Sequence, residues 1–304
     1  MRLSILTTFL ALVLFSSCKN DGPKADETKP ELKLSLAEWS LHKTLFDGKM
    51  TNLQFAAKAK ELGFGGIEYV NQFFKDKAEN TAYLDSLNAA AKSAGVQQVL
   101  IMIDGEGYLG EADSVRRDSA VNAHKKWVTA AKYLGCHSIR VNAHGEGTAE
   151  EVAVNVIKGL SALSQFAAQH GINVIVENHG GYSSNGAWLA DVMKKVNLPN
   201  CGTLPDFGNF CLKREGGAMW GKPCLEEYDR YKGIEELLPF AKGVSAKSYD
   251  FDAKGNDTKI DYKKMLDLVK ASKYAGFIGV EYEGEIDAEI EGIKKTKALI
   301  EKNW

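Results

Sequence analysis

The chain has 304 residues, of which 44% are hydrophobic, and a formal net charge of −2. Its 38 Lys and Arg residues are balanced by 40 Asp and Glu residues, and the cationic ones are spread along the chain rather than gathered in a stripe. This balance excludes an extended surface for a nucleic-acid backbone, so we predict no nucleic-acid partner.

The N-terminus has the pattern of a secretory signal. Arg2 precedes an apolar run over residues 3–15, and the small residues Ser16 and Ser17 lead to Cys18. The run is short for a transmembrane helix, which needs about 20 apolar residues. The pattern resembles a bacterial lipoprotein signal, and this resemblance implies that Cys18 is the lipidated first residue of the mature chain.

This resemblance divides the chain into three parts. We predict a signal peptide over residues 1–17, a lipidated polar tether over residues 18–31, and one barrel domain over residues 32–304. The predicted location is the cell envelope, and the predicted contact with the membrane is through the lipid anchor only.

From residue 32 onward, short β-rich runs alternate with amphipathic segments of helical period. This order is typical of a parallel sheet with crossover helices, and roughly 250 residues is the usual size of an eight-stranded barrel. We therefore predict an α/β fold, the (β/α)8 TIM barrel. The predicted strands cover residues 32–40, 66–70, 96–104, 137–142, 173–177, 201–206, 244–249 and 277–282.

The outer helices are easiest to predict where an apolar stripe lies opposite a charged one. Such segments cover residues 53–62, 113–134, 149–170 and 261–275. A glycine also stands between a predicted helix and the next strand, at Gly63, Gly95, Gly135, Gly171 and Gly276. We expect these glycines to adopt the left-handed conformation that returns the chain to the barrel.

Residues 207–233 form the one long stretch without a predicted element, and long loops of this kind are usually functional. The stretch could form a lid over the barrel. It contains Cys211 and Cys224, which could be disulfide-bonded or free. We expect Cys136 and Cys201, at the starts of strands, to be buried thiols.

Four predicted strands end in polar side chains that suit metal binding or proton transfer. These side chains are Glu177, Asp206, Lys247 and Glu281. Because the C-terminal ends of the strands of a TIM barrel converge on one mouth, they are expected to share a pocket. Their chemistry suits a divalent ion and an acid/base pair.

Three segments resemble the xylose isomerase-like TIM barrels, which include sugar isomerases and epimerases and type 2 apurinic endonucleases. The segments are VENH at residues 176–179, PDFGN at 205–209 and VEYEG at 280–284. The resemblance implies that Glu177, Asp206 and Glu281 hold a divalent metal, and that Glu177 and Glu281 also transfer the substrate's protons. Glu283 competes with Glu281 for this assignment, since both lie on one strand face.

The chain departs from this family pattern at one ligand position. Where family members often have His-x-Lys on the seventh strand, this sequence has Ser245-Ala246-Lys247. Three carboxylates can still bind Mn²⁺ or Mg²⁺, because hard cations prefer oxygen ligands. The alternative is a weakened or lost metal site. Lys247 is predicted to be catalytic, with a solvated charge at the barrel rim as the alternative.

Other polar and aromatic residues are candidates for binding the substrate. We predict that His179, Asn209, Arg140 and Trp39 contact a sugar, although His179 and Asn209 could equally satisfy loop backbone. Arg140 could also fix Glu177. Further aromatic residues that could line the site are Tyr69, Tyr182 and Trp220.

These features favour an exported carbohydrate isomerase or epimerase that removes a proton next to a sugar carbonyl with the help of a metal. A lyase or hydrolase acting on 3-keto-glycosides would use the same proton abstraction. A non-catalytic sugar-binding lipoprotein is the alternative from another class, and Ser245 is the residue that suggests it.

Overall fold

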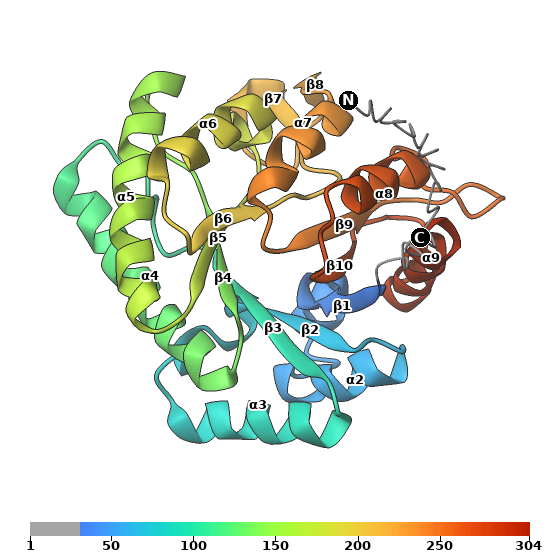
Figure 1. Cartoon of the computed structure of the whole chain (residues 1–304). Helices are drawn as coiled ribbons and strands as arrows, with labels where there is room; N and C mark the ends of the chain where they lie inside the picture. Colours follow the sequence, from blue (N-terminus) through green and yellow to red (C-terminus); the bar gives the residue numbers. More distant parts are fainter. Residues whose placement is uncertain (1–30) are drawn as a thin grey trace, which may run out of the picture.

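The computed structural model describes residues 31–304 and forms a barrel of eight parallel strands (Figure 1). The predicted signal peptide, Cys18 and the tether up to residue 30 lie outside the described residues. The strands are β1 (Lys33–Ala37), β2 (Gly66–Val70), β3 (Gln97–Met102), β4 (Ser138–Asn142), β5 (Asn173–Glu177), β6 (Cys201–Leu204), β9 (Val244–Ser248) and β10 (Phe277–Tyr282). They correspond one to one with the predicted strands and confirm the (β/α)8 fold.

The sheet closes into a barrel between β6 and β9, the two strands at the ends of its hydrogen-bonded order. The order of hydrogen-bonded strands is β6-β5-β4-β3-β2-β1-β10-β9. Parallel bridges join Thr203 to Ala241 and Asp206 to Ser245, and the Phe207 amide donates to the Ser245 carbonyl at 3.0 Å. The closure therefore brings the end of β6 directly against β9.

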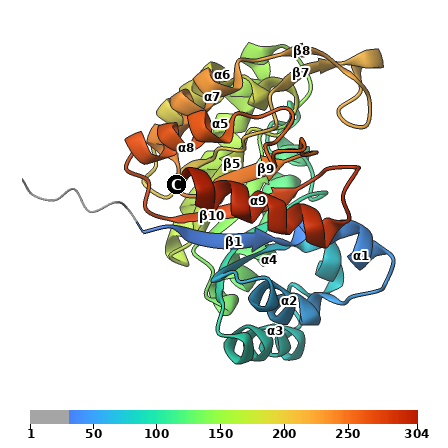
Figure 2. The ribbon, with the colours of Figure 1, turned by 90° about the vertical axis from the view of Figure 1, so that its right-hand side faces the viewer.

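Most of the helices surround the sheet and cover its outer face (Figures 1 and 2). They are α1 (His42–Phe46), α2 (Phe55–Glu61), α3 (Thr81–Ala94), α4 (Ser114–Leu134), α5 (Ala149–Gln169), α6 (Gly186–Val196), α7 (Arg230–Leu237), α8 (Tyr262–Ala271) and α9 (Glu289–Asn303). Among residues 31–304, none of the helices has the length and apolar character needed to cross a membrane.

Local sequence accounts for where the helices begin and end. Asp113 caps α4 by accepting from the Arg116 amide, and Thr148 and Glu151 form a capping box on α5. Four of the five predicted glycine turns are left-handed, with φ between 65° and 82°. The fifth is wrong: Lys273, not Gly276, has the positive φ of 60°.

The stretch over residues 207–233 is not irregular, contrary to the prediction. It contains an antiparallel hairpin of β7 (Cys211–Arg214) and β8 (Cys224–Glu227), and α7 begins soon after it. A disulfide joins Cys211 to Cys224, with a Cα–Cα distance of 5.8 Å. Cys136 is a buried free thiol, and Cys201 is a half-buried one.

Candidate active site

A cavity of about 720 Å³ lies at the mouth formed by the C-terminal ends of the strands. Six of the predicted site residues line it: Trp39, Arg140, His179, Asn209, Lys247 and Glu281. Glu177 and Asp206 lie behind this lining and are buried, with 1% and 0% of their surface exposed.

The three predicted metal ligands come together. One carboxylate oxygen from each of Glu177, Asp206 and Glu281 lies within 4.8 Å of the others, and all three residues are buried. Burial raises the pKa of Glu281 to about 8 and that of Asp206 to about 6 against the lowering effect of Lys247, and the charge of Glu177 raises both further. Both carboxyl groups therefore keep their protons to a higher pH than an ordinary Asp or Glu side chain does.

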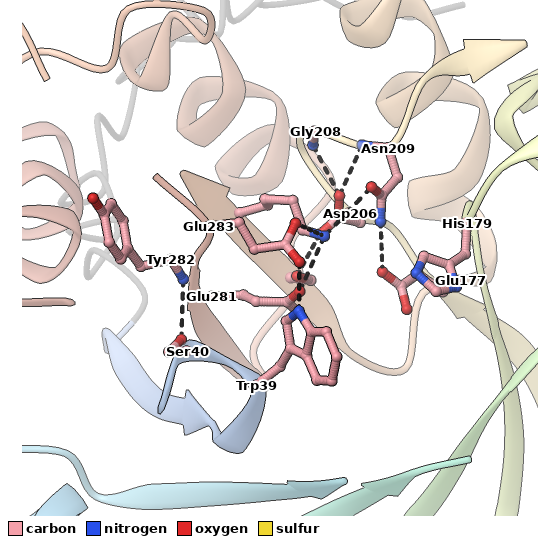
Figure 3. Close-up of polar contacts among 12 residues, drawn as sticks. Trp39, Ser40, Glu177, His179, Asp206, Gly208, Asn209, Glu281, Tyr282 and Glu283 are labelled. Atoms are coloured by element: carbon pink, nitrogen blue, oxygen red, sulfur yellow. Dashed lines mark hydrogen bonds and ion pairs between the residues drawn. The ribbon is translucent and has the colours of Figure 1, made fainter. Parts of the chain in front are cut away.

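Glu177 ends β5 and is held on both oxygens (Figure 3). Asn209 donates to its Oε1 at 2.9 Å, and Arg140 Nε lies 2.8 Å from its Oε2 as an ion pair without hydrogen-bond alignment. Arg140 also pairs with Asp104 at 2.8 Å. Burial raises the pKa of Glu177, and Arg140 partly offsets this effect. Arg140 therefore fixes Glu177, as one of the sequence predictions expected.

Asp206 follows β6 and organises the loop after it. Its Oδ1 accepts from the amides of Gly208 and Asn209, each at 2.9 Å (Figure 3). Its Oδ2 accepts from the Ser245 hydroxyl at 2.6 Å. The residue that stands in the family's histidine position is thus a hydrogen-bond donor to the neighbouring acidic residue.

Lys247 is a buried cation, with 2% of its side chain exposed, so the alternative of a solvated rim charge is wrong. Its Nζ lies 3.0 Å from both Glu281 and Glu283 and 3.4 Å from Asn209 Oδ1. Burial alone would lower the pKa of Lys247, but the two glutamates raise it well above its ordinary value. Burial likewise opposes ionisation of Glu283, but Lys247 lowers the pKa of Glu283 to about 2.

His179 belongs to a hydrogen-bonded chain that sets its tautomer. Asp104 accepts from the Asn142 amide at 2.7 Å, so the Asn142 carbonyl oxygen faces His179 Nδ1 at 2.8 Å and must accept from it. Burial, followed by the charge of Arg140, lowers the pKa of His179 well below its ordinary value. His179 is therefore neutral near pH 7 and keeps Nε2 as an acceptor.

Aromatic side chains form two walls of the cavity. Trp39 stacks on His42 at 4.8 Å and donates its Nε1–H to Glu283, and Trp220 lies 4.3 Å from the His179 ring (Figure 3 shows Trp39 and His179). The expected wall residues Tyr69 and Tyr182 do not line it. Tyr69 is in the core, and Tyr182 lies outside the lining.

The donor set fits a divalent cation. Five carboxyl groups meet two cationic side chains at the mouth: Asp104, Glu177, Asp206, Glu281 and Glu283, with Arg140 and Lys247. The close carboxylate oxygens suit a hard cation, so the buried acidic triad could hold a metal.

The sequence analysis did not select three residues of this network: Asp104, Asn142 and Glu283. Asp104 and Asn142 each end a predicted strand, the same signal that singled out Glu177, and it could have found them. Glu283 was set against Glu281 as a rival, whereas the structure places both on Lys247.

Comparison with known proteins gives a family and a fold. A family model described as the xylose isomerase-like TIM barrel matches residues 56–302. No curated protein is significantly similar in sequence.

Three solved structures are similar to the chain. The first is 3-keto-D-glucoside 4-epimerase from E. coli, with a TM-score of 0.67 and 15% identity over 90% of this chain and 100% of that one. The second is D-psicose 3-epimerase from Clostridium cellulolyticum H10, with a TM-score of 0.66 and 12% identity over 90% of this chain and 98% of that one. The third is the IOLI protein with a bound zinc atom, with a TM-score of 0.67 and 15% identity over 90% of this chain and 99% of that one. At these identities the similarity establishes the fold.

Proposed function

The chain belongs to the xylose isomerase-like TIM barrel family, and from this premise we propose that it is a carbohydrate isomerase or epimerase. The observation that supports this proposal most directly is the cluster of Glu177, Asp206 and Glu281 within 4.8 Å, against the inner wall of a cavity of about 720 Å³. Two of the similar structures are sugar epimerases by name.

The reaction is removal and return of a proton on a carbon next to a sugar carbonyl. Glu281 faces the cavity, and the raised pKa of its carboxyl group suits proton exchange near neutral pH. Lys247 and Arg140 also line the cavity, and their positive charges favour the negative charge that develops on the substrate oxygen. Glu177 is the second proton-transfer group.

The two glutamates are not equivalent in the free protein. Glu281 lies at the cavity wall, whereas Asn209 and Arg140 separate Glu177 from the cavity. Movement of the Asn209 amide away from Oε1 would make Glu177 more accessible to a carbon-bound proton. Sugar hydroxyl groups that replace this hydrogen bond would couple substrate binding to exposure of Glu177.

We assign the metal site to Glu177, Asp206 and Glu281, with Mn²⁺ or Mg²⁺ as the preferred ion. Such an ion polarises the substrate carbonyl as a Lewis acid when it is bound. The zinc atom in the similar IOLI protein supports a metal in this fold. Ser245 and Lys247 contact the same carboxylates as donors, so they compete with the ion for oxygen atoms.

We propose that the protein works in the cell envelope, attached through Cys18. Outside the cytoplasm, a free sugar is a better candidate than a sugar phosphate. The predicted partner is therefore a small-molecule carbohydrate without a phosphate group.

One observation favours a second candidate, a sugar-binding protein without catalysis. The oxygens of Glu177 and Asp206 already have protein partners, and the Ser245 hydroxyl is among them. These contacts within the protein would suit a site whose carboxylates only hold neighbouring side chains and backbone in place.

Exchange in heavy water separates these candidates. Free and 3-keto sugars are incubated with the protein in heavy water, with and without Mn²⁺, and deuterium on carbon is measured by mass spectrometry. We expect exchange in the wild type and a loss of about 10²–10⁴-fold in Glu281→Gln. Glu291→Gln, on the exposed face of α9, is the control and should keep full activity.

Two results would contradict the proposal. Absence of exchange on every sugar, together with sugar binding, would favour the binding protein. Full exchange in both Glu177→Gln and Glu281→Gln would show that these residues do not transfer the proton. Analysis of the products distinguishes an epimerase from a lyase or hydrolase acting on 3-keto-glycosides.

A further inference from the structure

The hairpin of β7 and β8 is an addition to the eight β/α units, and its loop reaches the mouth of the barrel. Arg214, Met219, Trp220 and Gly221 from this hairpin line the same cavity as Glu281. Trp220 keeps 43% of its surface exposed while its ring lies against His179. An indole exposed at a cavity wall can offer apolar contact and an N–H donor to a ligand.

Several contacts fix the position of this indole. The disulfide closes the base of the loop, and Arg214 donates to the carbonyl oxygens of Met219 at 3.1 Å and Lys222 at 2.9 Å. Gly180, at φ +84°, lets the loop approach closely, because a Cβ there would lie 3.0 Å from the Trp220 ring. The ring is thus positioned before any ligand arrives.

The cavity is larger than one sugar ring requires. At about 720 Å³, it lies well within the range of pockets that hold drug-sized ligands, and a single hexose would leave much of it filled with water. Its lining includes the charged side chains of Lys247 and Glu281 and the rings of Trp220 and His179. The cavity therefore offers both charged groups and the indole of Trp220, which has the guanidinium carbon of Arg214 5.9 Å from its ring centroid.

We propose that Trp220 forms a second sugar subsite, so that the substrate is a glycoside with at least two rings, of the disaccharide type. The reacting sugar lies at Glu281 and Lys247, and the second ring packs its C–H face on the indole. His179 supports the indole and offers Nε2 to a hydroxyl group of the sugar. This subsite rests on the proposed function and adds the size class of its substrate.

Binding measurements on matched sugars test the subsite. Isothermal titration calorimetry compares glucose with cellobiose and trehalose, and galactose with lactose. The wild type should bind at least one disaccharide about tenfold more tightly than its hexose. Trp220→Ala should weaken that disaccharide by about threefold to tenfold and leave the hexose unchanged.

Two further variants complete the design. Trp220→Phe keeps an aromatic face and should retain most of the preference for the disaccharide. Leu225→Ala removes an exposed apolar side chain from β8, outside the cavity lining, and should change neither affinity. Thermal unfolding checks that each variant folds.

The subsite is wrong if no disaccharide binds more tightly than its hexose, or if Trp220→Ala changes both affinities equally or neither. Deuterium exchange on the same sugars tests the proposed function separately. Disaccharide binding that depends on Trp220, without exchange on any sugar, would keep the subsite and contradict the isomerase or epimerase. Deuterium exchange in a protein whose preference for disaccharides does not depend on Trp220 would support the isomerase or epimerase and contradict the subsite.

Discussion

At the scale of single residues, the contacts of Ser245 and Asp206 bear on the proposed metal site. The Ser245 hydroxyl donates to Asp206 Oδ2 at 2.6 Å, and two backbone amides donate to Oδ1. A metal at Asp206 would have to share these oxygens with their present donors. An imidazole in this position would offer a nitrogen lone pair to a metal. The smaller serine instead donates a hydrogen bond to Asp206.

We expect Asp206→Asn to weaken Mn²⁺ binding by at least about tenfold, because it replaces a charged oxygen ligand by a neutral amide. The amide oxygen can still accept from Gly208 and Asn209, so the loop should keep its shape. Calorimetric titration with Mn²⁺ measures the effect. Asp191→Asn, at an exposed position on α6, is the control. Equal affinity in wild type and Asp206→Asn would remove Asp206 from the ligand set.

Glu38 gives a prediction about stability and pH. It follows β1, is fully buried, and accepts from the Val70 amide and the Asn52 side chain. Burial raises the pKa of Glu38 from 4.5 to about 8, and these two hydrogen bonds only partly offset the effect. The unfolded chain therefore loses this proton at lower pH than the folded protein does.

The sign of the effect follows from this order. The stability that protonated Glu38 contributes is complete below about pH 4.5 and is lost as the pH rises through about 8. Glu38→Gln mimics the protonated form, so it should match the wild type at pH 4 and exceed its stability by on the order of 2–4 kcal/mol at pH 8. Urea unfolding at both pH values measures this difference.

An exposed glutamate provides the comparison for Glu38. Glu61→Gln, on α2, should leave the pH dependence of the unfolding free energy unchanged. If Glu38→Gln and the wild type change stability in parallel between pH 4 and pH 8, the pKa of Glu38 is the same in the folded and unfolded protein, and burial does not raise it.

At the scale of elements, the strands were predictable and the hairpin was not. Barrel strands such as β3 and β5 contain a short apolar run bounded by polar residues, and the run Val174–Val176 is fully buried. The hairpin strands Cys211–Arg214 and Cys224–Glu227 are only four residues long and carry charges. The disulfide and a backbone ladder hold them together, and neither produces a hydrophobic pattern in the sequence.

The elements also explain which parts of the site could be predicted. The end of a strand places a side chain at the mouth, so Glu177 could be selected from its position, whereas the choice of Glu281 over Glu283 depended on the family resemblance. The partners of Lys247 could not, because Glu283 lies beyond the last residue of β10 and its direction depends on the turn that follows. Likewise, the contact between Trp220 and His179 joins two loops far apart in the sequence.

At the scale of the whole molecule, the first strand of the barrel begins at the end away from the mouth. All eight strands run in parallel, so β1 enters at the end of the barrel opposite the cavity (Figure 2). The α1 segment and the β7–β8 hairpin lie at the other end in the same view. A lipid anchor joined to the chain before residue 31 would therefore leave the mouth open to its substrate.

The anchor itself is testable, and its loss should leave the barrel intact. Because Cys18 is the predicted lipid-bearing residue, Cys18→Ser should abolish labelling with palmitate and move the protein from the membrane fraction to the soluble one. A second variant, with residues 1–18 replaced by a cleavable secretory signal, removes any contribution of an uncleaved apolar segment. Both proteins should unfold at the wild-type temperature, because the barrel core begins after residue 31. Palmitate labelling of Cys18→Ser, or retention of the second variant in membranes, would show that another part of the chain makes the attachment.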